Sequence, residues 1–231
     1  MVKGVVRALM VLIVLSGCAP VSGQAIEPHL IPVDPELAAF ESLRPYKLAV
    51  REHLLGRAVG CSVLVFPSFE AEWAVQIARD RGRPFVLYAA MDAPRWGALQ
   101  QRLEREGSPE AQVLQNLTVS VSRRTATLAQ DTAQVVEKAW SARLSASRRP
   151  VVFRRIIDGT SHLFLDSGSG PGQRVGLARS PEAGTPSAAL VVLVDALRHH
   201  VESAASAPTT SEAEVLGRAK DVLARLRVAA Y

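Results

Sequence analysis

Apolar and polar positions alternate along the chain in two different rhythms, one typical of strands and one typical of helices. Residues 59–66 form a continuous apolar run of strand length, which predicts a strand buried on both faces. Residues 72–91 contain two more apolar runs that meet at Arg81-Gly82, and this predicts two strands joined by a tight turn. Residues 117–123 alternate strictly and predict a half-buried strand.

Other segments repeat apolar side chains every three or four residues and predict helices. Thr185 and Pro186 open a long segment of this kind, and Ser211 with Glu214 forms a capping box that predicts the start of the last helix. Helices are therefore expected at residues 34–43, 46–55, 92–106 and 129–145, from Pro186 through Val201, and from Ser211 onward.

Residues 151–166 contain the clearest hairpin signal of the sequence. Asp158 and Gly159 form a preferred two-residue type I′ turn between two apolar runs. The register that this turn fixes would place Arg155 opposite His162. Hairpins that alternate with helices, without regular βαβ units, predict an α+β domain. We expect a mostly antiparallel sheet of about five or six strands, with N-terminal, middle and C-terminal helices packed on it.

The N-terminus has the three parts of an export signal. Lys3 and Arg7 form a basic head, residues 8–15 are apolar, and small residues follow. The apolar core is much shorter than the roughly 20 residues of a membrane-spanning helix. The sequence Leu15-Ser16-Gly17-Cys18 resembles the lipobox of bacterial lipoproteins. That resemblance implies that residues 1–17 are removed and that Cys18 carries lipid.

The same resemblance implies a location. Ala19 stands where an inner-membrane retention signal would place Asp, so we expect an outer-membrane lipid anchor with the protein facing the periplasm. Residues 18–33 would then be the lipidated cysteine and a flexible tether, and residues 34–231 a single domain. The alternative is ordinary secretion with cleavage after Ala25, which would give a soluble secreted or periplasmic protein.

Charge and cysteine content narrow the picture further. The leader takes two of the 27 basic residues, which leaves 25 against 22 acidic residues and a net charge of +3. This weak excess, almost all arginine, does not indicate a nucleic-acid partner. Lipid on Cys18 would leave Cys61 without a disulfide partner. Cys61 lies in an apolar run and is expected to be a buried, unreactive thiol.

Two places carry candidate chemistry. Ser68, Glu70 and Glu72 follow a predicted strand, and two carboxylates at this spacing could serve acid–base catalysis or bind a metal. No Gly-x-Ser-x-Gly elbow surrounds Ser68, which favours a polar turn. His162 could act as a base if Arg155 disfavours its protonation. No acidic residue at a suitable spacing would orient it, so a structural histidine is the favoured interpretation.

Metal and cofactor sites are not indicated. His199 and His200 are adjacent in a helix, where side chains point about 100° apart and cannot chelate one ion together. The glycine-rich segment 168–174 has neither a P-loop ending nor a GxGxxG fingerprint. We expect no cofactor, no metal and no catalytic residue, and treat Ser68, Glu70, Glu72, Arg155 and His162 as a possible surface site.

The mature chain resembles a group of uncharacterised proteobacterial envelope proteins. The shared features are an N-terminal helix, a PSF-x-x-EW element at residues 67–73, a DGT hairpin with an aromatic pair at residues 158–164, and a final helical pair. The resemblance implies location and fold. It attaches no activity.

Three functional hypotheses follow from these observations. The first is a non-catalytic, lipid-anchored envelope protein that binds another envelope component, because the anchor signal is strong and no catalytic constellation is complete. The second is an immunity protein that blocks a toxin in the periplasm. The third is a hydrolase that uses Ser68, or Glu70 and Glu72, with His162.

Overall fold

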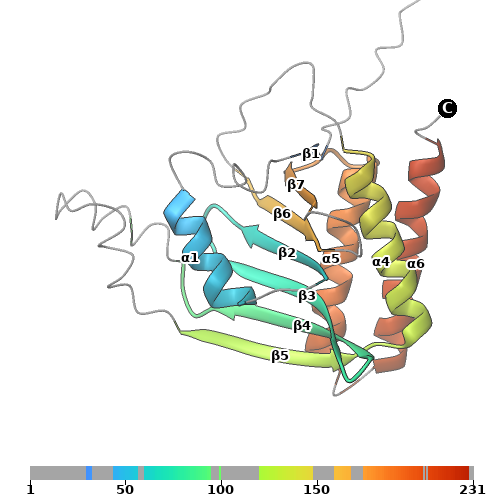
Figure 1. Cartoon of the computed structure of the whole chain (residues 1–231), viewed down its shortest axis with the longest axis horizontal. Coiled ribbons are helices and arrows are strands. Elements are labelled where there is room, and N and C mark those ends of the chain that lie inside the picture. The colour runs from blue at the N-terminus through green and yellow to red at the C-terminus, as the bar shows by residue number, and fades with distance from the viewer. Residues whose placement is uncertain are drawn as a thin grey trace, which may run out of the picture.

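The structure, a computed structural model, describes residues 30–32, 44–56, 60–94, 99, 120–147, 159–167, 174–204, 206 and 208–228. These residues form one antiparallel sheet and four helices (Figure 1). The strands are β1 (Ile31–Pro32), β2 (Cys61–Phe66), β3 (Trp73–Asp80), β4 (Arg83–Met91), β5 (Val121–Thr127), β6 (Ser161–Asp166) and β7 (Arg174–Arg179). The helices are α1 (Arg44–Leu55), α4 (Gln130–Ser145), α5 (Pro186–Ser203) and α6 (Pro208–Val228).

The sheet has the strand order β1-β7-β6-β2-β3-β4-β5, and every neighbouring pair is antiparallel. The predicted α+β fold class is confirmed, with the two-residue β1 as an additional strand. The turn between β3 and β4 falls where the sequence predicts it. Arg81 and Gly82 both have positive φ, 47° and 82°, as a type I′ hairpin turn requires.

Helices α4, α5 and α6 cover one face of the sheet (Figure 1). Each contributes a stripe of buried side chains at helical spacing, as the repeat of apolar residues in these segments predicts. The side chains that meet them alternate along the central strands. The main core therefore contains Val63, Val65, Trp73, Val75, Ile77, Val86 and Phe164 from the sheet with Val136, Trp140, Leu190, Leu193, Leu197, Val215 and Val222 from the helices.

Helix α1 packs on the opposite face and buries a second, smaller core. Tyr46, Val50 and Leu54 lie at helical spacing and contact strand residues that point away from the main core. The helix ends at Gly56, whose φ of 57° and backbone hydrogen bond to the Glu52 carbonyl match a glycine C-terminus. The sheet is thus covered on both faces, which explains the continuous apolar run of β2.

Helix α5 begins as predicted. Thr185 is the N-cap, and its hydroxyl accepts a hydrogen bond from the Ala188 amide, while Pro186 occupies the first turn. The predicted start of the last helix is wrong. Helix α6 begins at Pro208, and Ser211 is a buried residue within it. The Ser211 side chain faces His200 of α5, so it serves helix packing in place of a cap.

Two strand predictions need correction. Both edges of β6 are occupied, by β2 and by β7, and His162 lies opposite Val65 and Ala178. The predicted pairing that placed Arg155 opposite His162 is therefore wrong, and Arg155 itself lies outside the described residues. The strand expected at 117–123 is found as β5, Val121–Thr127. Its side chains are mostly exposed because β5 is the edge of the described sheet.

The expected helices at 34–43 and 92–106 lie outside the described residues, apart from positions 92–94 and 99. In the part of the chain that the structure covers, no helix has the length and apolarity needed to cross a membrane.

Candidate functional site

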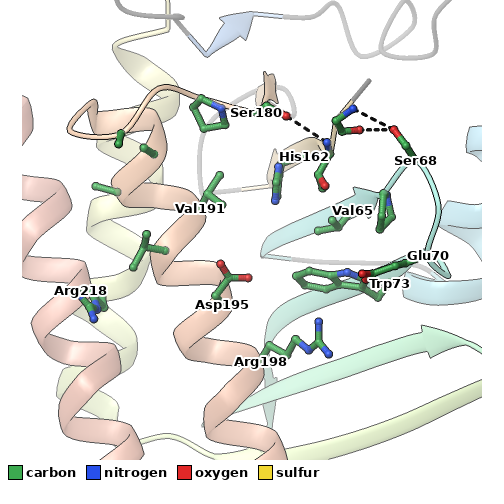
Figure 2. A pocket seen from close by; sticks show the side chains of 18 of the residues that line it. Val65, Ser68, Glu70, Trp73, His162, Ser180, Val191, Asp195, Arg198 and Arg218 are labelled. Atoms are coloured by element: carbon green, nitrogen blue, oxygen red, sulfur yellow. Dashed lines mark hydrogen bonds between the residues drawn. The ribbon is translucent and has the colours of Figure 1, made fainter. Parts of the chain in front are cut away.

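A cleft of about 760 Å³ opens where the ends of three strands meet the helical layer. Its wall on the sheet side comes from the end of β2 and the loop after it, the start of β3, and the residues around the start of β6. The other wall comes from α5 as far as Arg198 and from α6 (Figure 2). The contributing segments are up to 160 residues apart in the sequence, from Val65 to Arg225, so only the tertiary fold brings them together.

Ser68 lies on the rim of the cleft and is held by a reciprocal pair of hydrogen bonds. Its hydroxyl donates to the Gly159 carbonyl at 2.8 Å and accepts from the Gly159 amide at 3.0 Å. Figure 2 shows both bonds. The hydroxyl proton is thus already donated to a backbone oxygen, and no base accepts it. Ser68 thereby joins the loop after β2 to Gly159, two residues before the start of β6.

His162 forms part of the cleft wall and is 5% exposed. Its Nδ1 is buried without a hydrogen-bond partner among the described residues. The ring stacks near Phe164, with ring centroids 6.1 Å apart. Burial lowers the pKa of His162 to about 4, so the imidazole is neutral at pH 7. The sequence suggested that a neighbouring Arg155 would keep the His162 imidazole neutral, whereas in the structure the cause is burial.

Three arginines reach the cleft, and each is paired within its own helix. Arg198 bonds Glu202, Arg218 bonds Glu214, and Arg225 bonds Asp221, with nitrogen–oxygen distances of 2.9, 3.3 and 2.8 Å. Arg198 also lies over the rings of Trp73 and Tyr88, at 5.2 and 5.4 Å from their centroids. Their positive charges are therefore largely balanced.

Two cleft carboxylates are not balanced in this way. Glu70 and Asp195 form no ion pair or hydrogen bond within the described ranges. Figure 2 shows them on opposite walls, Glu70 beside Trp73 and Asp195 on α5. Burial raises the pKa of the Asp195 carboxyl, although Arg198 partly offsets this effect. A positive charge placed close to a carboxylate favours its ionised form.

The structure separates the predicted surface residues into two groups. Ser68, Glu70 and His162 line the one cleft. Glu72 lies elsewhere: it is buried on the α1 side and accepts a hydrogen bond from the Tyr46 hydroxyl. The reason is strand geometry, since Glu72 directly precedes Trp73, and neighbouring residues of an extended chain point to opposite faces. A joint role for Glu70 and Glu72 is therefore wrong.

The sequence reasoning missed Asp195 and Arg198. A signal for them does exist on α5. Val191 and Val192 are apolar but lie off the leucine stripe that faces the core, and Asp195 and Arg198 continue their line at helical spacing. Apolar side chains on a helix face other than the core-facing one indicate that this face also makes contacts.

The described residues contain no group of three or more His, Cys, Asp or Glu side chains that could hold a metal ion. Cys61 is a buried free thiol in the main core, and burial together with nearby Asp166 raises its pKa, as expected for an unreactive thiol. Cys18 lies outside the described residues.

Comparisons with protein-family models, with curated proteins and with solved structures return no match to this chain. The resemblance to proteobacterial envelope proteins therefore stays a prediction, and the function has to be argued from the leader sequence and the cleft.

Proposed function

We propose that this protein is a lipid-anchored, non-catalytic binding protein of the cell envelope. Lipid on Cys18 would hold it at the outer membrane, facing the periplasm, and residues 18–33 would be the tether. The lipobox Leu15-Ser16-Gly17-Cys18 supports the anchor. Each buried methylene of an acyl chain adds about 0.8 kcal/mol of membrane affinity, so a multiply acylated cysteine holds firmly.

The cleft is the observation that carries the binding role. Its volume of about 760 Å³ lies within the usual range of ligand sites, and its walls combine apolar side chains with a few polar groups. Val65, Val191 and Val192 supply apolar surface, while Glu70 and Asp195 supply carboxylates that have no ion-pair partner within the described residues. A partner component of the envelope would bind here.

The state of Ser68 supports binding over hydrolysis. A nucleophilic serine needs a base that accepts its proton, within about 3 Å. The Ser68 hydroxyl donates its proton to the Gly159 carbonyl, and the unpartnered Nδ1 of His162 forms no bond to it. The two side chains share the cleft without forming a nucleophile–base pair.

The anchor is tested by a Cys18→Ala variant followed by membrane fractionation. The wild-type protein is expected in the membrane fraction as an acylated chain that begins at Cys18. The variant cannot accept lipid and is expected to lose that modification and the mature N-terminus. Cys61→Ala keeps the lipobox and is the matched control. Mass spectrometry that finds an unmodified wild-type chain beginning at Ile26 would overturn the anchor.

The binding role is tested by affinity purification from the envelope fraction. An envelope component that co-purifies with the wild-type protein, and no longer does so after changes in the cleft, supports the proposal. Capture of a secreted toxin whose activity the protein blocks would replace it with the immunity hypothesis. Hydrolytic activity that is lost in Ser68→Ala would replace it with the hydrolase hypothesis.

A further inference from the structure

The cleft has a charge distribution that selects among ligands. All three of its arginines have carboxylate partners one helical turn away, whereas Glu70 and Asp195 have none within the described residues. A bound anion would have to displace an existing ion pair to reach a guanidinium group. A bound cation meets Glu70, which has no ion-pair partner within the described residues, and Asp195, whose neighbouring cation Arg198 is bonded to Glu202. The cleft is therefore complementary to positive charge.

A second feature points to a ligand independently of the acidic pair. His162 is 95% buried, lines the cleft and leaves Nδ1 unpaired. Buried polar groups are almost always hydrogen-bonded, and an exception needs an explanation. The χ2 torsion of a histidine ring is soft, so the ring can turn to meet a ligand in the cleft that its side chain lines. A polar group of a ligand would complete this hydrogen bond.

Apolar surface lies between the two features. Val65 and Val191 line the cleft near His162, and Trp73 lies beside Glu70 (Figure 2). Phe69, at the tip of the loop after β2, is 82% exposed, which is unusual for so large an apolar side chain. A ligand that spans this surface needs an apolar section.

We propose that the cleft binds an organic cation on an apolar stem, with the charge at Glu70 and Asp195 and a polar group at His162. A free aliphatic amine and a lysine side chain of a partner polypeptide both present this chemistry. This inference rests on the proposed binding function and names the ligand class of the same site. In the complex, the ammonium group of the ligand takes the place of water beside the two carboxylates, and its apolar stem covers the valine side chains of the cleft.

Matched probes test the inference on the mature full-length chain. Pentylamine is compared with pentan-1-ol, and the peptide acetyl-Val-Lys-Val-amide with its norleucine counterpart. Affinities are measured from NMR shifts of the tryptophan indole and histidine ring signals. Fragments of this size bind with dissociation constants on the order of 1 mM or weaker. We expect each cation to bind about fivefold more tightly than its neutral analogue, the upper range for an exposed ion pair.

Variants assign this preference to particular residues. Glu70→Gln and Asp195→Asn are each expected to reduce the fivefold preference, and the double variant to abolish it. Asp80→Asn changes the net charge equally at the far end of β3 and is expected to preserve the preference. His162→Phe keeps an aromatic ring but removes its hydrogen-bonding atoms. It is expected to weaken the binding of the peptides, which carry amide groups, more than the binding of pentylamine.

The outcomes separate the possible ligands and the two proposals. A preference seen only with the peptides indicates a partner polypeptide, and one seen only with pentylamine indicates a small amine. Equal affinity for charged and neutral probes, or an unchanged preference in the double variant, overturns the inference. An envelope partner that still co-purifies with the double variant would leave the binding function standing while removing the cation site.

Discussion

His162 shows how one position can link fold stability to pH. The strand β6 that carries it lies between β2 and β7, so its ring is enclosed by the sheet and the helical layer. Desolvation there disfavours the imidazolium ion and lowers the pKa of His162 to about 4, against an ordinary value of 6.5. In the unfolded chain the same ring would titrate near its ordinary value.

This difference predicts a loss of stability in acid. Between pH 6.5 and 4 the unfolded state binds a proton at His162 that the folded state does not bind, so unfolding becomes more favourable as pH falls. This pKa difference corresponds to a loss of about 3 kcal/mol in the free energy of unfolding, and the loss is complete below pH 4. Urea denaturation at pH 7 and at pH 4 measures it.

The matched variant for this prediction is His162→Phe, which keeps a planar ring and removes the titrating nitrogen. Its free energy of unfolding is expected to fall by about 3 kcal/mol less than that of the wild type over the same pH interval. Equal losses in the two proteins would show that His162 is not the linked group.

Some elements approach each other so closely that only glycine fits, and among the described glycines Gly176 leaves the least room for a Cβ. Gly176 lies in β7 and faces two leucine side chains, that of Leu30 before β1 and that of Leu144 in α4. A Cβ at position 176 would lie 2.5 Å from Leu30 Cδ2 and 2.7 Å from Leu144 Cδ2. Both leucines are fully or almost fully buried and have little room to move.

Gly176→Ala is therefore expected to destabilise the protein by about 1–3 kcal/mol through overpacking. Gly217, on the exposed side of α6, is the matched control because a Cβ there would meet no atom within 4 Å. Gly217→Ala is expected to stabilise α6 by about 0.5–1 kcal/mol, since glycine is a poor helix former. Thermal or urea unfolding of the two variants should shift in opposite directions. The same sign in both would contradict this description of the packing.

At the scale of the whole molecule, one hydrogen-bond network joins three elements. His200 of α5 contacts the Ser211 hydroxyl of α6 at 2.9 Å through Nδ1, and the Thr127 carbonyl of β5 at 2.8 Å through Nε2. The carbonyl can only accept, so Nε2 donates to it, while Nδ1 has the Ser211 hydroxyl as its partner. The edge strand and both C-terminal helices are thereby fixed to one another.

Ser211→Ala is expected to lower the free energy of unfolding by about 1–3 kcal/mol, because the buried Nδ1 of His200 would lose this partner. Thr210→Ala removes a hydroxyl from the adjacent, exposed position and should change stability by less than about 0.5 kcal/mol. Hydrogen exchange of α6 measures the same effect locally. Equal values for the two variants would mean that the network contributes nothing.

The sequence by itself determined the local elements and much of the core. Continuous apolar runs gave the buried strands, helical stripes gave α4 and α5, and Arg81-Gly82 and Thr185-Pro186 set their boundaries. These features succeed because each depends on neighbours within a few residues, where turn and capping chemistry is local. The leader sequence also predicts the lipid anchor, which depends on a short contiguous motif.

Only the tertiary structure decided which strands lie side by side and which polar groups share the cleft. The type I′ signal at Asp158-Gly159 favoured a local hairpin, but β6 instead pairs with β2 and β7, because long-range burial outweighs the preference of a two-residue turn. The same pairing places His162 and Ser68 in one cleft, and the packing of α5 on the sheet adds Asp195 to it. Strand order arises from the free energy of the whole core, so no short window of the sequence contains it.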